Sequence, residues 1–424
     1  MRKLIRNVRV MDPGDGFDAI TDLAIADGRI VLREERIADF PADEELDGTG
    51  LIACPGLIET SFHAHSPGHD RDGDMASELR AAVAGGITQV LLRPDTQPVT
   101  DTPAVVQEQR QLAARLGLAR VHCAGALTTA LQGKALSEMA AMLDAGVLLF
   151  SQAKVALPDA ALLRLALSYA ADLGRPVWLH PEDVDLAAQG VMHEGGLSLR
   201  LGLPGRPAAA EQVGIYRDIT VAALSGCAVH FPQVSTASAV ALVAEARRRG
   251  ESVTCGVSIH NLLLCEQDVG FFNNHAKVLP PLRTIAERDA LRRALASGTI
   301  SAISSDHCPW GVDREGMTFV QAPFGISAVE WLLPLALRLV DEDILDLMTV
   351  LGLLTQGPAQ VMGLPAPSLA VGAIADMCIF NPDTYFTLDP TRSWSRGQNL
   401  PYGQWQLRGQ VLYTLVAGRI VYRG

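Results

Sequence analysis

The sequence lacks the features that would place it outside the ordinary globular proteins. No apolar run approaches the roughly 18 residues that a membrane-spanning helix needs. There is no basic stripe, and the formal net charge of −12 argues against nucleic acid or an anionic membrane as a partner. The start of the chain lacks the long apolar segment of a signal peptide, so we expect a cytoplasmic protein.

Paired cysteine motifs and nucleotide-binding motifs are also missing. The seven cysteines are far apart, include no C-x-x-C pair and lie in several cases in strand-like stretches. We expect reduced, buried thiols, and we expect Cys308 to be a packed thiol rather than a nucleophile. No G-x-G-x-x-G follows the first barrel-like strand, which argues against a doubly wound dinucleotide-binding sheet.

What the sequence does contain is a repeated alternation of short apolar runs and long amphipathic ones. Eight strand–helix units over about 250 residues are typical of an α/β fold of the (β/α)₈ (TIM) barrel type. We predict this barrel for residues 54–365, and we expect residues 1–53 and 366–424 to meet as one small β domain. The eight apolar runs begin at Gly56, Ile87, Ala119, Val147, Pro176, Cys227, Ser252 and Thr299.

Polar side chains follow most of these predicted strands, where a TIM barrel collects its functional residues. Two histidines from the first strand, one from the fifth and an aspartate from the eighth would suit a hydrolytic zinc. The metal would lower the pKa of a bound water, and the aspartate would move the proton. A single histidine at a strand end is more often a hydrogen-bonded structural residue, so pattern alone leaves both interpretations open. In chain order these residues are His63, His65, Asp95, Gln152, His180, Gln233, His260 and Asp306.

Several longer segments carry a family resemblance. The segments "AAVAGGITQVLLRPDTQPVTDTP", "KVLPPLR", "SSDHCPW" and "PYGQWQLRGQVLYTLVAGRIVY" are examples. Along nearly its whole length, the chain resembles the dihydroorotase branch of the amidohydrolase superfamily. Active members of that branch read P-G-L-I-D-x-H-x-H-x-R-x-P-G around the first strand.

The resemblance implies a shifted first-strand motif here. In the same register, Ser61 stands at the first metal-ligand position, His63 at the second, and His65 at the position of a substrate-binding arginine. Two residues along a strand displace a side chain by roughly 6.5 Å. Metal–nitrogen bonds of roughly 2 Å cannot absorb that shift without a local rearrangement of the backbone.

The resemblance also implies that most of the remaining site is altered. The fifth-strand histidine and the eighth-strand aspartate of the family are present, but the bridging carboxylate, the sixth-strand histidine and two substrate-binding asparagines are replaced. We therefore expect a vestigial site with no catalytic residue, a lost zinc site and no cofactor. Any residual metal would be held weakly by His63, His180 and Asp306. The replaced positions carry Gln152 (with Lys154 nearby but out of place), Gln233, Asp95 and Leu279.

Three interpretations follow. The first is a pseudoenzyme that resembles the non-catalytic dihydroorotase-like chain of bacterial aspartate carbamoyltransferase. That resemblance implies a hetero-oligomer with transferase catalytic chains in pyrimidine biosynthesis, for which a dodecamer is one arrangement. The alternative is a mononuclear zinc amidohydrolase with a shifted metal site, acting on another cyclic amide. A third is a pocket that binds a metabolite without changing it.

Overall fold

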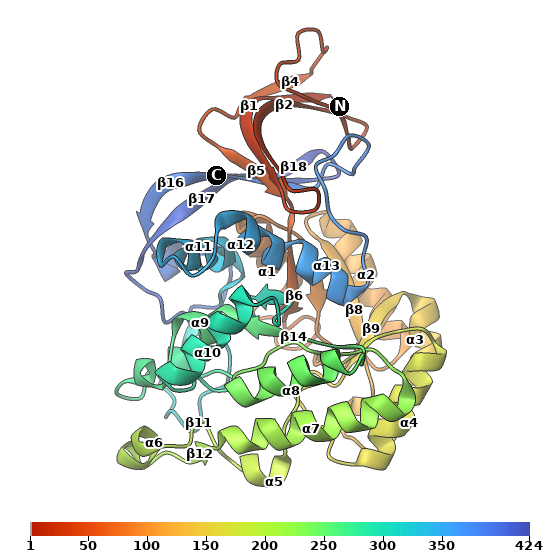
Figure 1. The fold of residues 1–424 in the computed structure, drawn as a ribbon, viewed down its shortest axis with the longest axis vertical. Helices are drawn as coiled ribbons and strands as arrows, with labels where there is room; N and C mark the ends of the chain where they lie inside the picture. The colour runs from red at the N-terminus through yellow and green to blue at the C-terminus, as the bar shows by residue number, and fades with distance from the viewer. Residues whose placement is uncertain (1, 315) are drawn as a thin grey trace.

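A closed parallel barrel forms the centre of the molecule, which the computed structural model describes over residues 2–314 and 316–424 (Figure 1). All eight predicted strands are present, and each pairs with its neighbour in chain order. Phe62 and His307 form a parallel bridge between the first and last strands and close the barrel. The strands are β6 (Leu57–Phe62), β7 (Ile87–Leu92), β8 (Arg120–Ala126), β9 (Val147–Ser151), β10 (Val177–Trp178), β13 (Val229–Phe231), β14 (Val253–Ser258) and β15 (Ala302–Ser304).

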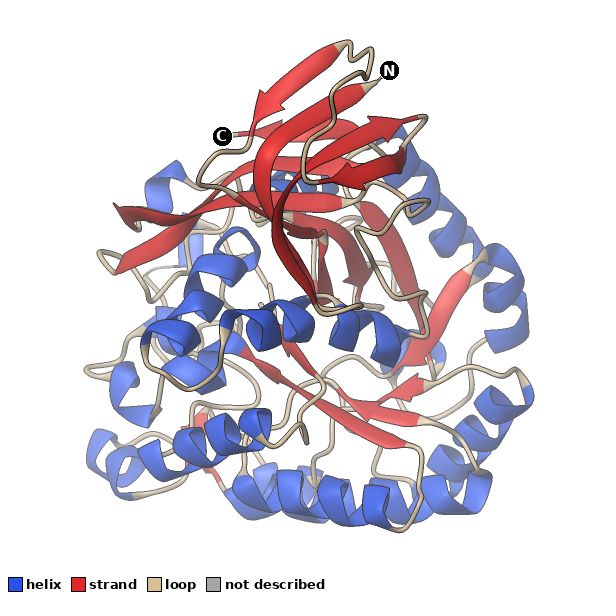
Figure 2. Cartoon of the chain, turned by 45° about the horizontal axis from the view of Figure 1, so that its top comes forward, coloured by secondary structure: helices blue, strands red, loops and turns tan. Residues whose placement is uncertain are grey.

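Helices surround these strands, as the amphipathic runs predicted (Figure 2). Glycine caps the C-terminal end of several helices because it adopts a left-handed conformation easily. Gly226, which caps α7, has a φ of 69°. Residues 190–206 add the short pair β11 (Met192–His193) and β12 (Gly205–Arg206). The helices are α1 (Met75–Ala84), α2 (Pro103–Leu116), α3 (Met139–Ala145), α4 (Ala160–Asp172), α5 (Val184–Ala187), α6 (Gly196–Leu201), α7 (Ala208–Ser225), α8 (Ala237–Arg248), α9 (Ile259–Leu263), α10 (Ile285–Ala296), α11 (Leu332–Asp341), α12 (Leu347–Leu354) and α13 (Gln356–Met362).

The two ends of the chain meet in a second sheet beside the barrel, as predicted (Figure 1). Cys54 near the start pairs directly with Cys378 near the end, in antiparallel register. Helix α11 packs against this sheet, and Arg120 of the barrel forms an ion pair with Asp376 beside it. The strands are β1 (Lys3–Asp12), β2 (Phe17–Ala26), β3 (Arg29–Glu34), β4 (Glu44–Asp47), β5 (Ile52–Pro55), β16 (Met377–Thr387), β17 (Gln406–Val416) and β18 (Arg419–Arg423).

The barrel interior is filled by apolar side chains, among them Ile58, Leu91 and Trp178, and α13 packs against them. This apolar core stabilises the barrel. The polar side chains at the C-terminal ends of the strands therefore belong to a site that the fold does not need for its stability. Across residues 2–314 and 316–424, no helix combines the length and the apolar character needed to cross a lipid bilayer.

One buried acid on α7 predicts a pH dependence of stability. Burial raises the pKa of Asp218 to about 7, although Arg217 donates to its carboxylate at 2.8 Å. Between the unfolded-state pKa of 3.8 and the folded-state pKa of about 7, the folded protein keeps the Asp218 proton while the unfolded chain has lost it. The free energy of unfolding therefore falls as the pH rises through this range. We expect Asp218→Asn to become more stable relative to the wild type between pH 5 and 8, by about 1–3 kcal/mol.

Urea unfolding across this pH range would measure the effect. Asp172→Asn, at an exposed position, makes the same change of charge and serves as the control. Parallel pH profiles of Asp218→Asn and the wild type would contradict the prediction.

Candidate metal and substrate site

A cavity of about 320 Å³ opens at the C-terminal ends of the barrel strands. Its wall comes from the segments that directly follow β6, β7, β9 and β15, together with loops farther along the chain. Four of the residues singled out in the sequence line it: His63, His65, Asp95 and Leu279. The remaining wall includes His69, Arg93, Lys154, Cys308, Trp310 and Phe324.

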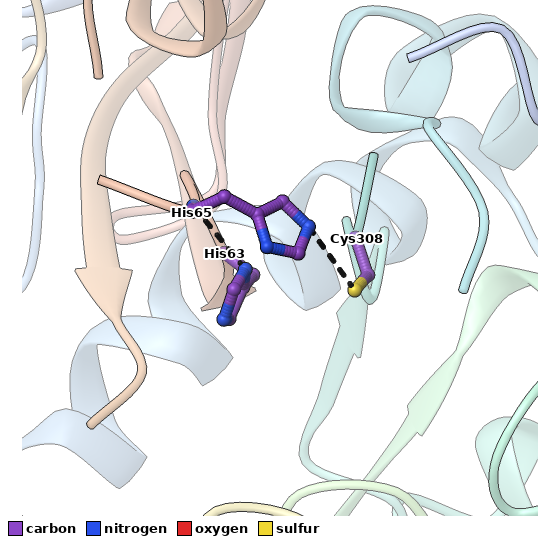
Figure 3. Close-up of side chains that lie close together, drawn as sticks. All are labelled: His63, His65 and Cys308. Atoms are coloured by element: carbon purple, nitrogen blue, oxygen red, sulfur yellow. Dashed lines mark hydrogen bonds between the residues drawn. The ribbon is translucent and has the colours of Figure 1, made fainter. Parts of the chain in front are cut away.

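Two histidines and a cysteine come together in this wall (Figure 3). One ligand atom from each of His63, His65 and Cys308 can be chosen so that all three lie within 4.8 Å of one another. The imidazole rings of the two histidines are 4.0 Å apart, and Cys308 Sγ lies 3.9 Å from His65 Nε2. Among the described residues, this is the group of His, Cys, Asp or Glu that could hold a metal ion.

The backbone makes this cluster possible by leaving strand geometry. Strand β6 ends at Phe62, and His65 has a φ of 51°, which is left-handed. The rise of roughly 6.5 Å per two residues that holds in a strand therefore does not separate His63 from His65. Each ring is also held from outside: His63 Nε2 lies 3.1 Å from the Asp95 carbonyl, and His65 Nε2 lies 2.7 Å from the Pro309 carbonyl.

Burial sets the protonation of the three side chains. It lowers the pKa of His65 to about 2 and also lowers the pKa of His63, so both imidazoles are neutral at pH 7. Neutral imidazole is the form that binds metals. Burial raises the pKa of the Cys308 thiol to about 11, and a bound metal would have to displace that proton.

Asp306 lies apart from this cluster, in a bonded network of its own. Lys154 Nζ donates to Asp306 Oδ2 at 2.6 Å and to the Leu279 carbonyl at 2.7 Å. Ser61 Oγ donates to the other carboxylate oxygen of Asp306 at 2.9 Å. We expected Lys154 to be out of place. Its long side chain nevertheless reaches the centre of the barrel, which spacing along β9 does not reveal.

The negative charge at Asp95 is also compensated. Arg93 Nε donates to Asp95 Oδ1 at 3.1 Å, and Arg93 Nη2 pairs with the second oxygen. Burial alone would raise the pKa of Asp95, but the Arg93 guanidinium holds it well below its usual value. The cavity therefore presents an ion pair at this replaced substrate-binding position.

Two of the predicted site residues bond to neighbouring loops and do not line the cavity. Gln152 Nε2 donates to Thr128 Oγ1 at 2.8 Å and to the Leu131 carbonyl at 3.1 Å, so its amide is used within the neighbouring loop. His180 Nε2 lies 3.7 Å from Glu182 Oε2, which also pairs with Arg206 at 2.5 Å. Neither Gln152 nor His180 is among the residues that line the cavity.

The ligand types suit one zinc ion rather than a pair of metals. Because the Nε2 atom of each histidine faces a carbonyl, zinc would bind through the Nδ1 atoms, and at His63 it would replace the 3.3 Å hydrogen bond from the His65 backbone N–H. Catalytic zinc is held by three protein ligands, and imidazole and thiolate are ligand types that zinc prefers. A two-metal arrangement would need ligands at Ser61 and Gln233, whose hydroxyl and amide are poor ligands for zinc. Sequence reasoning missed Cys308 as a ligand candidate. The signal available was its position two residues after Asp306, at the end of the eighth strand.

Comparisons with known proteins agree with this architecture. A family model described as dihydro-orotase-like matches residues 50–239, and one described as amidohydrolase family matches residues 267–422. A "Dihydroorotase-like protein" of Pseudomonas aeruginosa is 42% identical over 99% of both chains. This chain belongs to the dihydroorotase-like amidohydrolases. A relative from Syntrophotalea carbinolica, named "Dihydroorotase", is 39% identical over 100% of this chain and 99% of its own.

The solved structures show the same fold at lower identity. The L-hydantoinase (dihydropyrimidinase) of Arthrobacter aurescens superimposes with a TM-score of 0.89, covering 99% of this chain and 96% of its own at 22% identity. This likeness supports the predicted barrel with its β domain.

Two of our expectations are therefore wrong. The interpretation of a family member without enzymatic activity is contradicted by a relative named "Dihydroorotase" that matches this chain along its whole length. The expectation of a lost metal site is contradicted by the cluster of His63, His65 and Cys308. The sequence indicated His63, His180 and Asp306 as the residues that could hold a metal, whereas the structure brings His63 together with His65 and Cys308.

Proposed function

We propose that the chain is a mononuclear, zinc-dependent hydrolase of a cyclic amide. The observation that carries the proposal is the cluster of His63, His65 and Cys308 on the wall of the 320 Å³ cavity. These three residues would hold the ion. The zinc would supply a bound water of lowered pKa, as in other zinc hydrolases.

The side chains around the cluster suit the two polar faces of a cyclic amide. Lys154 uses two of its three ammonium hydrogens on Asp306 and the Leu279 carbonyl. The third is available to a carbonyl oxygen of the substrate. The Asp95 carboxylate, on the same wall, can accept a hydrogen bond from the amide N–H. A donor and an acceptor in one cavity fit the –CO–NH– edge of a cyclic amide.

Metal analysis together with a substrate panel tests this proposal. We expect about one zinc per chain after gentle purification. We also expect hydrolysis of at least one member of a panel containing dihydroorotate, dihydrouracil, hydantoin and succinimide. Added chelator should stop the reaction, and added zinc should restore it. A folded chain that binds no zinc and opens none of these rings would overturn the proposal.

We also propose that the chain assembles with aspartate carbamoyltransferase catalytic chains into a hetero-oligomer. Support comes from the sequence resemblance, in which Ser61, Gln233 and Leu279 stand at the altered positions, and from a relative named "Dihydroorotase-like protein". Co-expression with the cognate transferase, followed by size-exclusion chromatography with light scattering, should give one complex. Separate elution with undiminished transferase activity would contradict the proposal.

A further inference from the structure

A second, much smaller void lies inside the barrel below the proposed zinc site. Its volume is about 20 Å³, and a buried void needs about 10–15 Å³ to hold one water-sized guest. Its wall shares Arg93 and Lys154 with the larger cavity but includes none of His63, His65 and Cys308. The void is therefore a separate site, and its own wall determines what it can bind.

Three hydrogen-bond donors on this wall have no partner. They are the Arg93 Nη1 group, the Trp178 indole N–H and the Gln233 amide nitrogen. Trp178 is 2% exposed and Gln233 is 4% exposed, so bulk water does not satisfy them. A buried donor without a partner costs about 1–3 kcal/mol, and three such donors on one small void indicate a guest that accepts hydrogen bonds.

The charges on the wall indicate the sign of that guest. The charged residues that line the void are Arg93 and Lys154, and no carboxylate is among the lining residues. Asp306 is bonded to Lys154 and lies 3.9 Å from Arg93 Nη1, while Asp95 is bonded to Arg93 on the side of the larger cavity. Arg93 therefore keeps an Nη1 group without a hydrogen-bond partner, whereas Lys154 contributes charge to the wall.

We propose that this void binds a single small anion of halide size, for which chloride is the natural example. The Trp178 indole, the Gln233 amide and the Arg93 Nη1 group donate to the anion. Arg93 and Lys154 bring positive charge to the wall, and the carboxylates that pair with them, Asp95 and Asp306, do not line the void. A water molecule would satisfy the same donors without a charge, and the Thr60, Ser61 and Ser151 hydroxyls on the wall could accept its hydrogens. The salt series described next distinguishes the two guests. This site goes beyond the proposed hydrolase and would exist whether or not the chain turns over a substrate.

Halide-dependent stability and bromide scattering test the proposal on the full chain. Thermal unfolding is measured on chelator-treated protein in sodium chloride, sodium bromide and sodium gluconate at equal ionic strength. We expect chloride and bromide to raise the Tm with a saturable dependence, because an anion that binds only the folded state stabilises it. Gluconate is too large for the void and should have no such effect. Crystals grown in bromide should show an anomalous peak inside the void.

Two tryptophan variants provide a matched comparison. Trp178→Phe removes one donor from the void, whereas Trp331→Phe removes an indole N–H that also lacks a partner but lines a different groove. The bromide concentration at half-saturation should rise by about tenfold or more for Trp178→Phe and stay unchanged for Trp331→Phe. Equal Tm values in all three salts, a bromide peak only on the protein surface, or equal effects of the two variants would overturn the proposal.

Discussion

Replacement of Cys308 by alanine is expected to remove the zinc that we propose and to lower cyclic-amide hydrolysis at least about 100-fold. The side chain supplies the one thiolate of the cluster, and without it only His63 and His65 remain. Two ligands are fewer than the three that a catalytic zinc normally has. Loss of an outer-shell partner alone typically costs 10–100-fold in affinity or activity, so a lost ligand should cost more.

The measurements are zinc content, the rate of hydrolysis and the rise in Tm on adding zinc, which should vanish in Cys308→Ala. Cys123→Ala is the matched control, because Cys123 is also a buried thiol, one whose pKa burial raises to about 12, and it lies in β8 outside the cluster. Full zinc content and full activity in Cys308→Ala would show that other residues hold the zinc and would contradict this prediction.

The second large effect is expected at Glu78, which holds three parts of the fold together. Its carboxylate is fully buried on α1 and accepts hydrogen bonds from His307 Nε2 at 2.9 Å, Ser395 Oγ at 2.5 Å and the Arg396 amide at 3.1 Å. His307 also closes the barrel against Phe62. Removing the carboxylate leaves these buried donors without an acceptor. We expect Glu78→Ala to lose about 3–5 kcal/mol of unfolding free energy.

Urea unfolding measures this loss directly. Glu78→Gln keeps one acceptor oxygen and should lose less than the alanine variant. Glu108→Ala, at an exposed position of α2, should stay within about 0.5 kcal/mol of the wild type. A Glu78→Ala protein that unfolds at the wild-type urea concentration would show that water replaces the carboxylate at little cost.

The barrel could be predicted from the sequence because its signals are local. The run beginning at Ile87 became β7, and α7 ends where Gly226 takes a left-handed conformation. The meeting of the two termini was also predictable, since strands at both ends of the chain need partners. The polar residues that follow the predicted strands also indicated that the site lies at the C-terminal ends of the strands, where His63 and His65 are found.

The composition of the site was harder to predict because it depends on distances across the barrel. Lys154 was judged by its spacing along one strand, yet its side chain spans the interior and bonds Asp306. Asp95 stood out as a replaced position, but the sequence did not show that Arg93 two residues earlier neutralises it. The left-handed backbone at His65 has no signature in the motif itself, because a positive φ is uncommon for residues other than glycine.

The sequence by itself determined the order of strands and helices, the two-part architecture and the end of the barrel that carries polar side chains. These depend on periodicity and on residues that start and end helices, which act within a few neighbours. Only the tertiary structure decided that His65 turns back toward His63, that Cys308 joins them and that Lys154 engages Asp306. The contacts of Cys308 with His65 and of Lys154 with Asp306 join residues more than 150 positions apart in the chain. The turn at His65 is local, but the Pro309 carbonyl that holds its ring comes from the distant end of the barrel. Such contacts form only when the barrel closes and burial makes each unpaired polar group costly.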